Sequence, residues 1–254
     1  MESAELPRVA SGLGAAVLAG ALNSVAGGGS FISFPALVFL GLPSIVANAT
    51  NNTAMWLGTL SSVGGYREEL SGWRGLWPAL VVSLVGGVIG AELLLRTPEQ
   101  TFSQLIPWLL LFATLVFAGS DALRTLAGRP AASEERIELR WLPALFVVAI
   151  YGGYFGAGIS ILILALFAVS GWTHIHRMNA AKVLLATSVN GIAVIPFLLA
   201  HKIAWREALI FTVGAVVGGY VGARIARRID PRIVRLAVVI VGVGMTVYFF
   251  VRRA

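Results

Sequence analysis

Three asparagines lie within five consecutive positions of the sequence, at Asn48, Asn51 and Asn52, with Thr50 and Thr53 beside them. Their spacings of three and four place the asparagines on one side of a helix. Each amide offers hydrogen-bond donors and acceptors without a charge. Polar side chains inside an apolar segment are costly, which makes these residues candidates for ligand binding. Helix capping and hydrogen bonding between helices are the structural alternative.

A second polar set lies in the other half of the chain, where Asn179 and Lys182 are three residues apart and the same helix face continues to Asn190. A lysine inside an apolar segment needs a partner or a wet cavity, unless its chain extends to a membrane surface. No carboxylate lies near it in the sequence. This pattern favours a bound anion as the partner of Lys182.

Two glycine clusters interrupt apolar segments, at residues 27–29 and 156–158. Paired interrupted helices indicate a transporter site, and free helix ends present N–H groups that suit an anion. Close helix packing is the usual alternative for such residues. The candidate ligand-binding positions at the two interruptions are Gly28, Gly29, Ser30, Gly156 and Gly158, with Asn23 just upstream.

The overall composition is that of a membrane protein. Of 254 residues 57% are apolar and only 12% are charged, and the mean hydropathy is +0.85. Soluble domains carry about 25% charged residues. The absence of cysteine excludes disulfides and thiol chemistry. The net charge of +7 comes from basic residues at segment ends, which favours membrane orientation or anionic lipid over nucleic acid.

Apolar runs separated by short polar breaks predict the helices. They lie at about 9–26, 30–42, 44–65, 73–95, 101–123, 141–158, 159–171, 178–200, 204–223 and 233–251. Most are long enough for a spanning helix, which needs about 20 residues. The charged stretch between them predicts three parts: a first transmembrane repeat at 1–123, a polar linker at 124–140 and a second repeat at 141–254.

The two halves resemble each other in sequence. Residues 47–51 align with 178–182, 73–74 with 205–206, and 86–91 with 218–223, in one order and at nearly one spacing. The prediction is an all-α polytopic membrane protein of two homologous four-segment repeats, each with a glycine-broken first hydrophobic region. The small residues recurring in the last pair predict close helix packing: Gly86, Gly87 and Gly90, and Gly218, Gly219 and Gly222.

The orientation of the repeats depends on the interrupted regions. If each is a plain crossing, the halves are parallel; if each is a hairpin that returns to the side it entered, the halves are inverted. The hairpin arrangement collects most arginines on one face, whereas the plain arrangement divides them almost evenly. The positive-inside rule therefore favours inversion.

The sequence resembles the TauE/SafE family of membrane permeases. The resemblance is carried by residues 22–30, by Pro35 with residues 47–51, and by residues 176–182, and it covers nearly the whole chain. It implies a multi-pass protein of the bacterial-type inner (plasma) membrane that carries small sulfur-containing anions such as sulfite or organosulfonates. The anion itself and the direction of transport stay open.

The resulting hypothesis is a secondary transporter, an exporter by family resemblance, that alternates access between its two repeats. The asparagines of residues 48–52 would converge with Asn179 and Lys182 on a small anionic substrate. No acidic residue lies deep in an apolar segment, so the coupling ion stays open, and no cofactor or metal is expected. The partners are the anion and membrane lipid, and a homo-oligomer stays open. The alternatives are an anion channel, a non-transporting membrane assembly subunit and an intramembrane enzyme.

Overall fold

The described part of the chain is built of helices. The computed structural model describes residues 2–63, 76–119, 138–172, 174–226 and 231–253. The helices of the first half are α1 (Glu2–Ala26), α2 (Ser30–Phe39), α3 (Ser44–Val63), α5 (Trp77–Arg96) and α6 (Glu99–Ala118). Those of the second half are η3 (Leu139–Trp141), α8 (Leu142–Tyr154), α9 (Ile159–Val169), α10 (Ile175–Leu199), α11 (Trp205–Ala226) and α12 (Pro231–Arg253).

Helix bounds follow the predicted apolar runs with one large difference. Helix α1 begins at Glu2, seven residues before its apolar run, because backbone hydrogen bonding and residues such as Glu and Ala favour a helix whatever their hydropathy. The predicted linker lies outside the described residues except for 138–140.

Several helices are apolar on their outer and inner faces alike. On α5, Trp77, Val81 and Val85 are half exposed or more, while Gly86 and Gly90 are buried on the opposite side. Helices that are apolar all round are typical of a lipid environment. Among the described residues, three helices are long and apolar enough to cross a membrane: Trp77–Arg96, Glu99–Ala118 and Arg177–Leu199.

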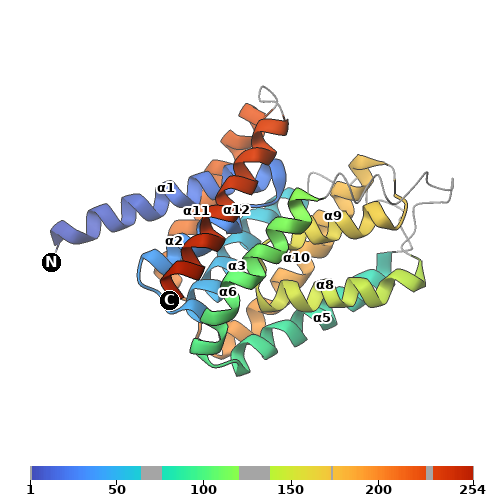
Figure 1. The fold of residues 1–254 in the computed structure, drawn as a ribbon, viewed down its shortest axis with the longest axis horizontal. Coiled ribbons are helices and arrows are strands. Elements are labelled where there is room, and N and C mark those ends of the chain that lie inside the picture. The colour runs from blue at the N-terminus through green and yellow to red at the C-terminus, as the bar shows by residue number, and fades with distance from the viewer. Residues whose placement is uncertain (1, 64–75, 120–137, 173, 227–230, 254) are drawn as a thin grey trace.

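The two halves interlock rather than stand apart (Figure 1). Helix α1 of the first half packs along α11 of the second, and α8 of the second packs along α5 of the first. Helix α5 also packs against α10, and α11 packs against α3. Two further contacts join the halves, between α3 and α10 and between α6 and α12. The hydrophobic core consequently contains residues from both halves.

Glycines allow the two closest of these contacts. A Cβ on Gly90 would overlap the carbonyl oxygen of Ile150 in α8, and one on Gly218 would overlap the carbonyl of Val17 in α1. Gly86, Gly87 and Gly222 also leave no room for a Cβ, whose nearest heavy atom would lie at 2.6, 2.7 and 2.5 Å. Close packing, predicted for these glycines, is confirmed. Gly219 differs, since its nearest neighbour lies 3.8 Å from a built Cβ and the residue lines a cavity instead.

Helices α1 and α2 form a hairpin. The chain turns through Gly27, whose φ of +77° is accessible to glycine at little cost. Gly29 then lies against Ala19 and Asn23, while at the other end of α2 the carbonyl of Leu40 accepts a 2.8 Å hydrogen bond from Arg8. Helix α2 therefore runs back along α1. Its 10 residues span about 15 Å, half of a bilayer core.

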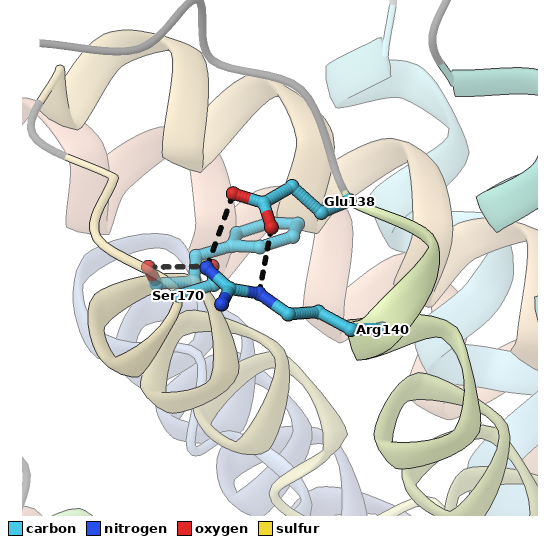
Figure 2. Close-up of polar contacts among 4 residues, drawn as sticks. Glu138, Arg140 and Ser170 are labelled. Carbon is cyan, nitrogen blue, oxygen red and sulfur yellow. Dashed lines mark hydrogen bonds and ion pairs between the residues drawn. The ribbon is translucent and has the colours of Figure 1, made fainter. Parts of the chain in front are cut away.

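Helices α8 and α9 have a similar arrangement. Gly156 and Gly158 have φ values of +74° and +82°, and α9 has only 11 residues. Figure 2 shows Ser170, which follows the last residue of α9, together with the ion pair between Arg140 and Glu138, which precedes α8 (Nε–Oε2 2.6 Å). This pair is exposed and contributes at most about 1 kcal/mol.

Candidate functional site

A cavity of about 430 Å³ lies where the two halves meet. Its walls come from α1, α2, α3, α9, α10 and α11. The polar residues lining it are Asn23, Ser24, Ser30, Thr59, Ser160, Lys182, Thr187, Asn190 and Tyr220. Ser24 and Tyr220 are exposed and form part of its rim. The cavity therefore has a partly polar lining, is open at one side and is large enough for a small solute.

The two interrupted regions touch at this cavity. A Cβ built on Gly27 would lie 3.0 Å from the Cβ of Ser160. Ser30 is the first residue of α2 and Ser160 the second of α9, and both line the cavity. The first N–H groups of a helix lack intrahelical acceptors and carry a partial positive charge. Two helix N-termini thus meet at one place, which suits an anion.

Lys182 supplies a full positive charge to the same cavity. Its Nζ donates to Asn179 Oδ1 at 3.2 Å, one turn earlier on α10. In the part of the chain that the structure describes, no carboxylate pairs with this ammonium. The guanidinium of Arg224 stands near the rim, 4.3 Å from the ring centroid of Tyr220. Around Lys182 the lining therefore has excess positive charge.

The three asparagines of α3 lie outside the cavity lining, and they are almost fully buried. Asn48 Nδ2 donates to the carbonyl of Tyr154, the last residue of α8, at 3.0 Å. Asn51 Oδ1 accepts a 2.5 Å hydrogen bond from Ser33 Oγ in α2. Asn52 lies against Gly156, with Nδ2 3.4 Å from a built Cβ. Helix α3 thus contacts both interrupted regions through these side chains.

The structure divides the predicted site residues into three groups. Ser30, Gly156 and Lys182 line the cavity, and Asn179 contacts Lys182. Asn48, Asn51 and Asn52 form a buried cluster behind it. Gly28, Gly29 and Gly158 shape the interruptions: a Cβ on Gly29 would overlap Ala19, and one on Gly158 would lie 3.0 Å from Ala113. The three asparagines therefore do not line the cavity together with Lys182, and the geometry does not bring all four residues around one ligand there.

Sequence reasoning missed several lining residues, among them Thr59, Ser160 and Thr187. A signal for two of them was present. Thr187 continues the helical face from Lys182 toward Asn190, and Thr59 aligns with Asn190 when the two halves are superposed in sequence. Thr59 and Thr187 lie 3.5 Å apart through their hydroxyls, on the crossing of α3 with α10.

Comparison with known proteins identifies the family of this chain. Residues 12–249 match the family described as sulfite exporter TauE/SafE. The chain belongs to this family. A probable membrane transporter protein of Haemophilus influenzae is 29% identical over 89% of this chain and 88% of its own length. YfcA of Escherichia coli K12, also named a probable membrane transporter protein, is 28% identical over 91% and 85%.

A further TauE/SafE relative, the probable membrane transporter protein ORF9 of a Sinorhizobium species, is 26% identical over 92% of this chain and 88% of its own length. No solved structure matches the chain. The TauE/SafE family is a family of transporters, so the protein is a membrane transporter of this type and the intramembrane enzyme is excluded. Within the described residues no group of three or more His, Asp or Glu could hold a metal ion.

Proposed function

We propose that the protein is a secondary transporter of small sulfur-containing anions, which bind in the cavity between the two halves. The observation that carries this proposal is that Lys182, which has no carboxylate partner among the described residues, and the N-termini of α2 and α9 meet at one cavity. The Lys182 ammonium and two partially positive helix N-termini stabilise an oxyanion and repel a cation. The hydroxyls of Ser30, Ser160 and Thr187 add further donors.

Membership of the TauE/SafE family supports the sulfur-containing class, since the family is described by sulfite export. Sulfite and the sulfonate group share three oxygens around one sulfur, and a cavity of about 430 Å³ holds either. A multi-pass protein of the bacterial-type inner membrane, exporting its anion, fits this family. The names of the relatives specify a transporter and no substrate.

An anion panel on the purified protein tests the substrate class. Thermal unfolding in detergent is measured with sulfite, methanesulfonate, sulfate and acetate as sodium salts at one ionic strength. Sulfite or the sulfonate should raise the unfolding midpoint, because a ligand at a hundredfold excess over its Kd stabilises the folded protein by about 2.7 kcal/mol. Acetate serves as the control for charge alone. Equal stabilisation by all four anions, or by none, would remove the basis for the proposed substrate class.

We further propose that the halves are homologous repeats in inverted orientation, which rock against each other to alternate access. Two features support this. The reciprocal packing of α1 on α11 and of α8 on α5 is what a two-fold relation between repeats produces. At the crossing of α3 and α10, Thr59 lies near Thr187 and Trp56 near Gly191, so the paired helices run in opposite directions.

Single cysteines at Arg96 and Arg224 test the inversion, because the chain has no cysteine of its own. Both arginines are exposed near the C-terminal ends of the proposed repeat partners α5 and α11. In inverted repeats these ends lie on opposite sides of the membrane. A membrane-impermeant maleimide should therefore label one variant in intact cells and the other only after permeabilisation. Labelling of both variants in intact cells, or of neither, would favour parallel repeats.

A further inference from the structure

Behind the cavity, buried oxygen atoms gather at the C-terminal end of α8. Asn48 and Asn52 are 0% and 2% exposed and lie one turn apart on the same face of α3. Asn48 Nδ2 donates to the carbonyl of Tyr154, and this bond fixes the orientation of the amide. Within the described part of the chain, Asn48 Oδ1 and both polar atoms of the Asn52 amide have no hydrogen-bond partner. Buried amides without partners are costly and rare, so these oxygens require an explanation.

The backbone adds oxygens of the same kind. Helix α8 ends at Tyr154, and within its last turn the Tyr151 carbonyl accepts a hydrogen bond from the N–H of Phe155. The following carbonyls, from Gly152 to Tyr154, lack intrahelical donors. The carbonyl oxygen of Gly152 lies 3.5 Å from the position a Cβ would take on Gly156, and the Asn52 amide flanks the same position. A carbonyl oxygen has two lone pairs, and Tyr154 has one left beside its bond to Asn48. The Asn52 atom nearest to this position is Nδ2, but no hydrogen bond to a described residue fixes the amide, and a half-turn about its last bond brings Oδ1 to the same place.

The partial charge at the C-terminal end of α8 is opposite in sign to the charge that lines the cavity. Helix C-termini carry a partial negative charge, whereas the N-termini of α2 and α9 are partially positive. One interruption therefore presents a negative helix end on the side of Asn48 and Asn52 and a positive end toward Lys182. Gly156 lies between the two, since it lines the cavity and contacts Asn52. An anion is disfavoured at the end of α8, and a cation is favoured.

The second half offers an internal comparison. Asn48 aligns with Asn179, and Asn52 aligns with Val183. In the second half Asn179 Oδ1 accepts a hydrogen bond from the ammonium of Lys182. In the first half the aligned oxygen, Asn48 Oδ1, has no donor, and the residue aligned with Lys182 is the neutral Asn51. The second half thus has the ammonium of Lys182 at the position where the first half has the neutral amide of Asn51.

We propose that Asn48, Asn52 and the carbonyls of the last turn of α8 bind a small monovalent cation of the Na⁺ class. Neutral carbonyl and amide oxygens are the ligands that hard cations take, and the ends of broken helices coordinate Na⁺ in other transporters. Bound there, the cation is the coupling ion for the anion on the other side of Gly156. This coupling role rests on the proposed function, whereas binding of the cation does not.

Thermal unfolding of the full-length protein in chloride salts tests the binding, in the absence of any sulfur-containing anion. Na⁺ should raise the unfolding midpoint by about 5 °C at a hundredfold excess over Kd, relative to choline at equal ionic strength. Asn52→Leu should abolish the difference. Thr53→Val is the matched control on α3, because the Thr53 hydroxyl already donates to the carbonyl of Ala49. It should keep the full response to Na⁺.

Equal midpoints in Na⁺ and choline would overturn the site, because a water molecule on these oxygens would respond to neither salt. A Na⁺ response that survives in Asn52→Leu would overturn it as well. The wild-type comparison stands even where Asn52→Leu fails to fold. Coupling has a separate readout: anion uptake into proteoliposomes should fall about tenfold when external Na⁺ is replaced by choline. If Na⁺ binds but uptake of the anion does not depend on Na⁺, the binding site stands and the proposed coupling role is wrong.

Discussion

Replacing Lys182 by alanine is expected to lower the affinity of the cavity for its anion about 100-fold, with a corresponding loss of transport at low substrate concentration. Removing one partner of a desolvated charge pair costs about 2–5 kcal/mol, and about 3 kcal/mol corresponds to that factor. Lys182 is the lysine that lines the cavity, and its ammonium is held by the neutral Asn179 alone among described residues. The measurement is uptake of labelled sulfite or sulfonate into proteoliposomes across a range of concentrations.

The chain provides a matched control for this substitution. Its second lysine, Lys202, is exposed after the end of α10 and does not line the cavity. Lys202→Ala removes the same charge from the protein and should leave transport unchanged. Lys182→Arg keeps the charge with a different shape and should retain part of the affinity. Wild-type uptake by Lys182→Ala would contradict the proposed anion site, as would an equal loss in Lys202→Ala.

The elements of the fold were largely predictable because each follows from local chemistry. Apolar runs of about 20 residues predicted helices such as α5 and α6 within a few residues. Glycine at residues 27 and 156 marks turns with positive φ, where a Cβ would be strained. The small residues at helical spacing on α5 and α11 predicted close packing for the same reason. These properties depend on one residue or one helix at a time.

The site was less predictable because it depends on which face of a helix meets which neighbour. Spacing placed Asn48, Asn51 and Asn52 on one side of α3, but that side faces the ends of α2 and α8. The residues of α3 that line the cavity are Met55, Gly58 and Thr59, of which only Thr59 has a polar side chain. On α10, by contrast, the face that includes Lys182 and Asn190 is the cavity face.

The largest expected effect on stability comes from adding one methyl group to Gly90 or Gly218. The new Cβ of Gly90→Ala would overlap the carbonyl of Ile150 and lie 2.7 Å from the backbone nitrogen of Tyr154. Backbone atoms cannot rotate away as a side chain can, so α5 and α8 must separate. Overpacking of this kind costs about 1–3 kcal/mol or more. The unfolding midpoint in detergent should fall by about 5–10 °C in Gly90→Ala.

The same change is expected in Gly218→Ala, where the Cβ would overlap Val17 of α1. Gly14→Ala and Gly244→Ala are the matched controls, because a Cβ at either position meets no atom within 4 Å. Alanine in an exposed helix interior is more stable than glycine by about 0.5–1 kcal/mol, so their midpoints should stay level or rise slightly. Similar losses in Gly90→Ala and Gly218→Ala would show that the contact of α5 with α8 and the contact of α11 with α1 both tolerate no added methyl group. Because each contact joins one half to the other, a loss at either place would show that packing between the halves contributes to the stability of the protein. Midpoints equal to those of the controls would contradict the close approach of these helices.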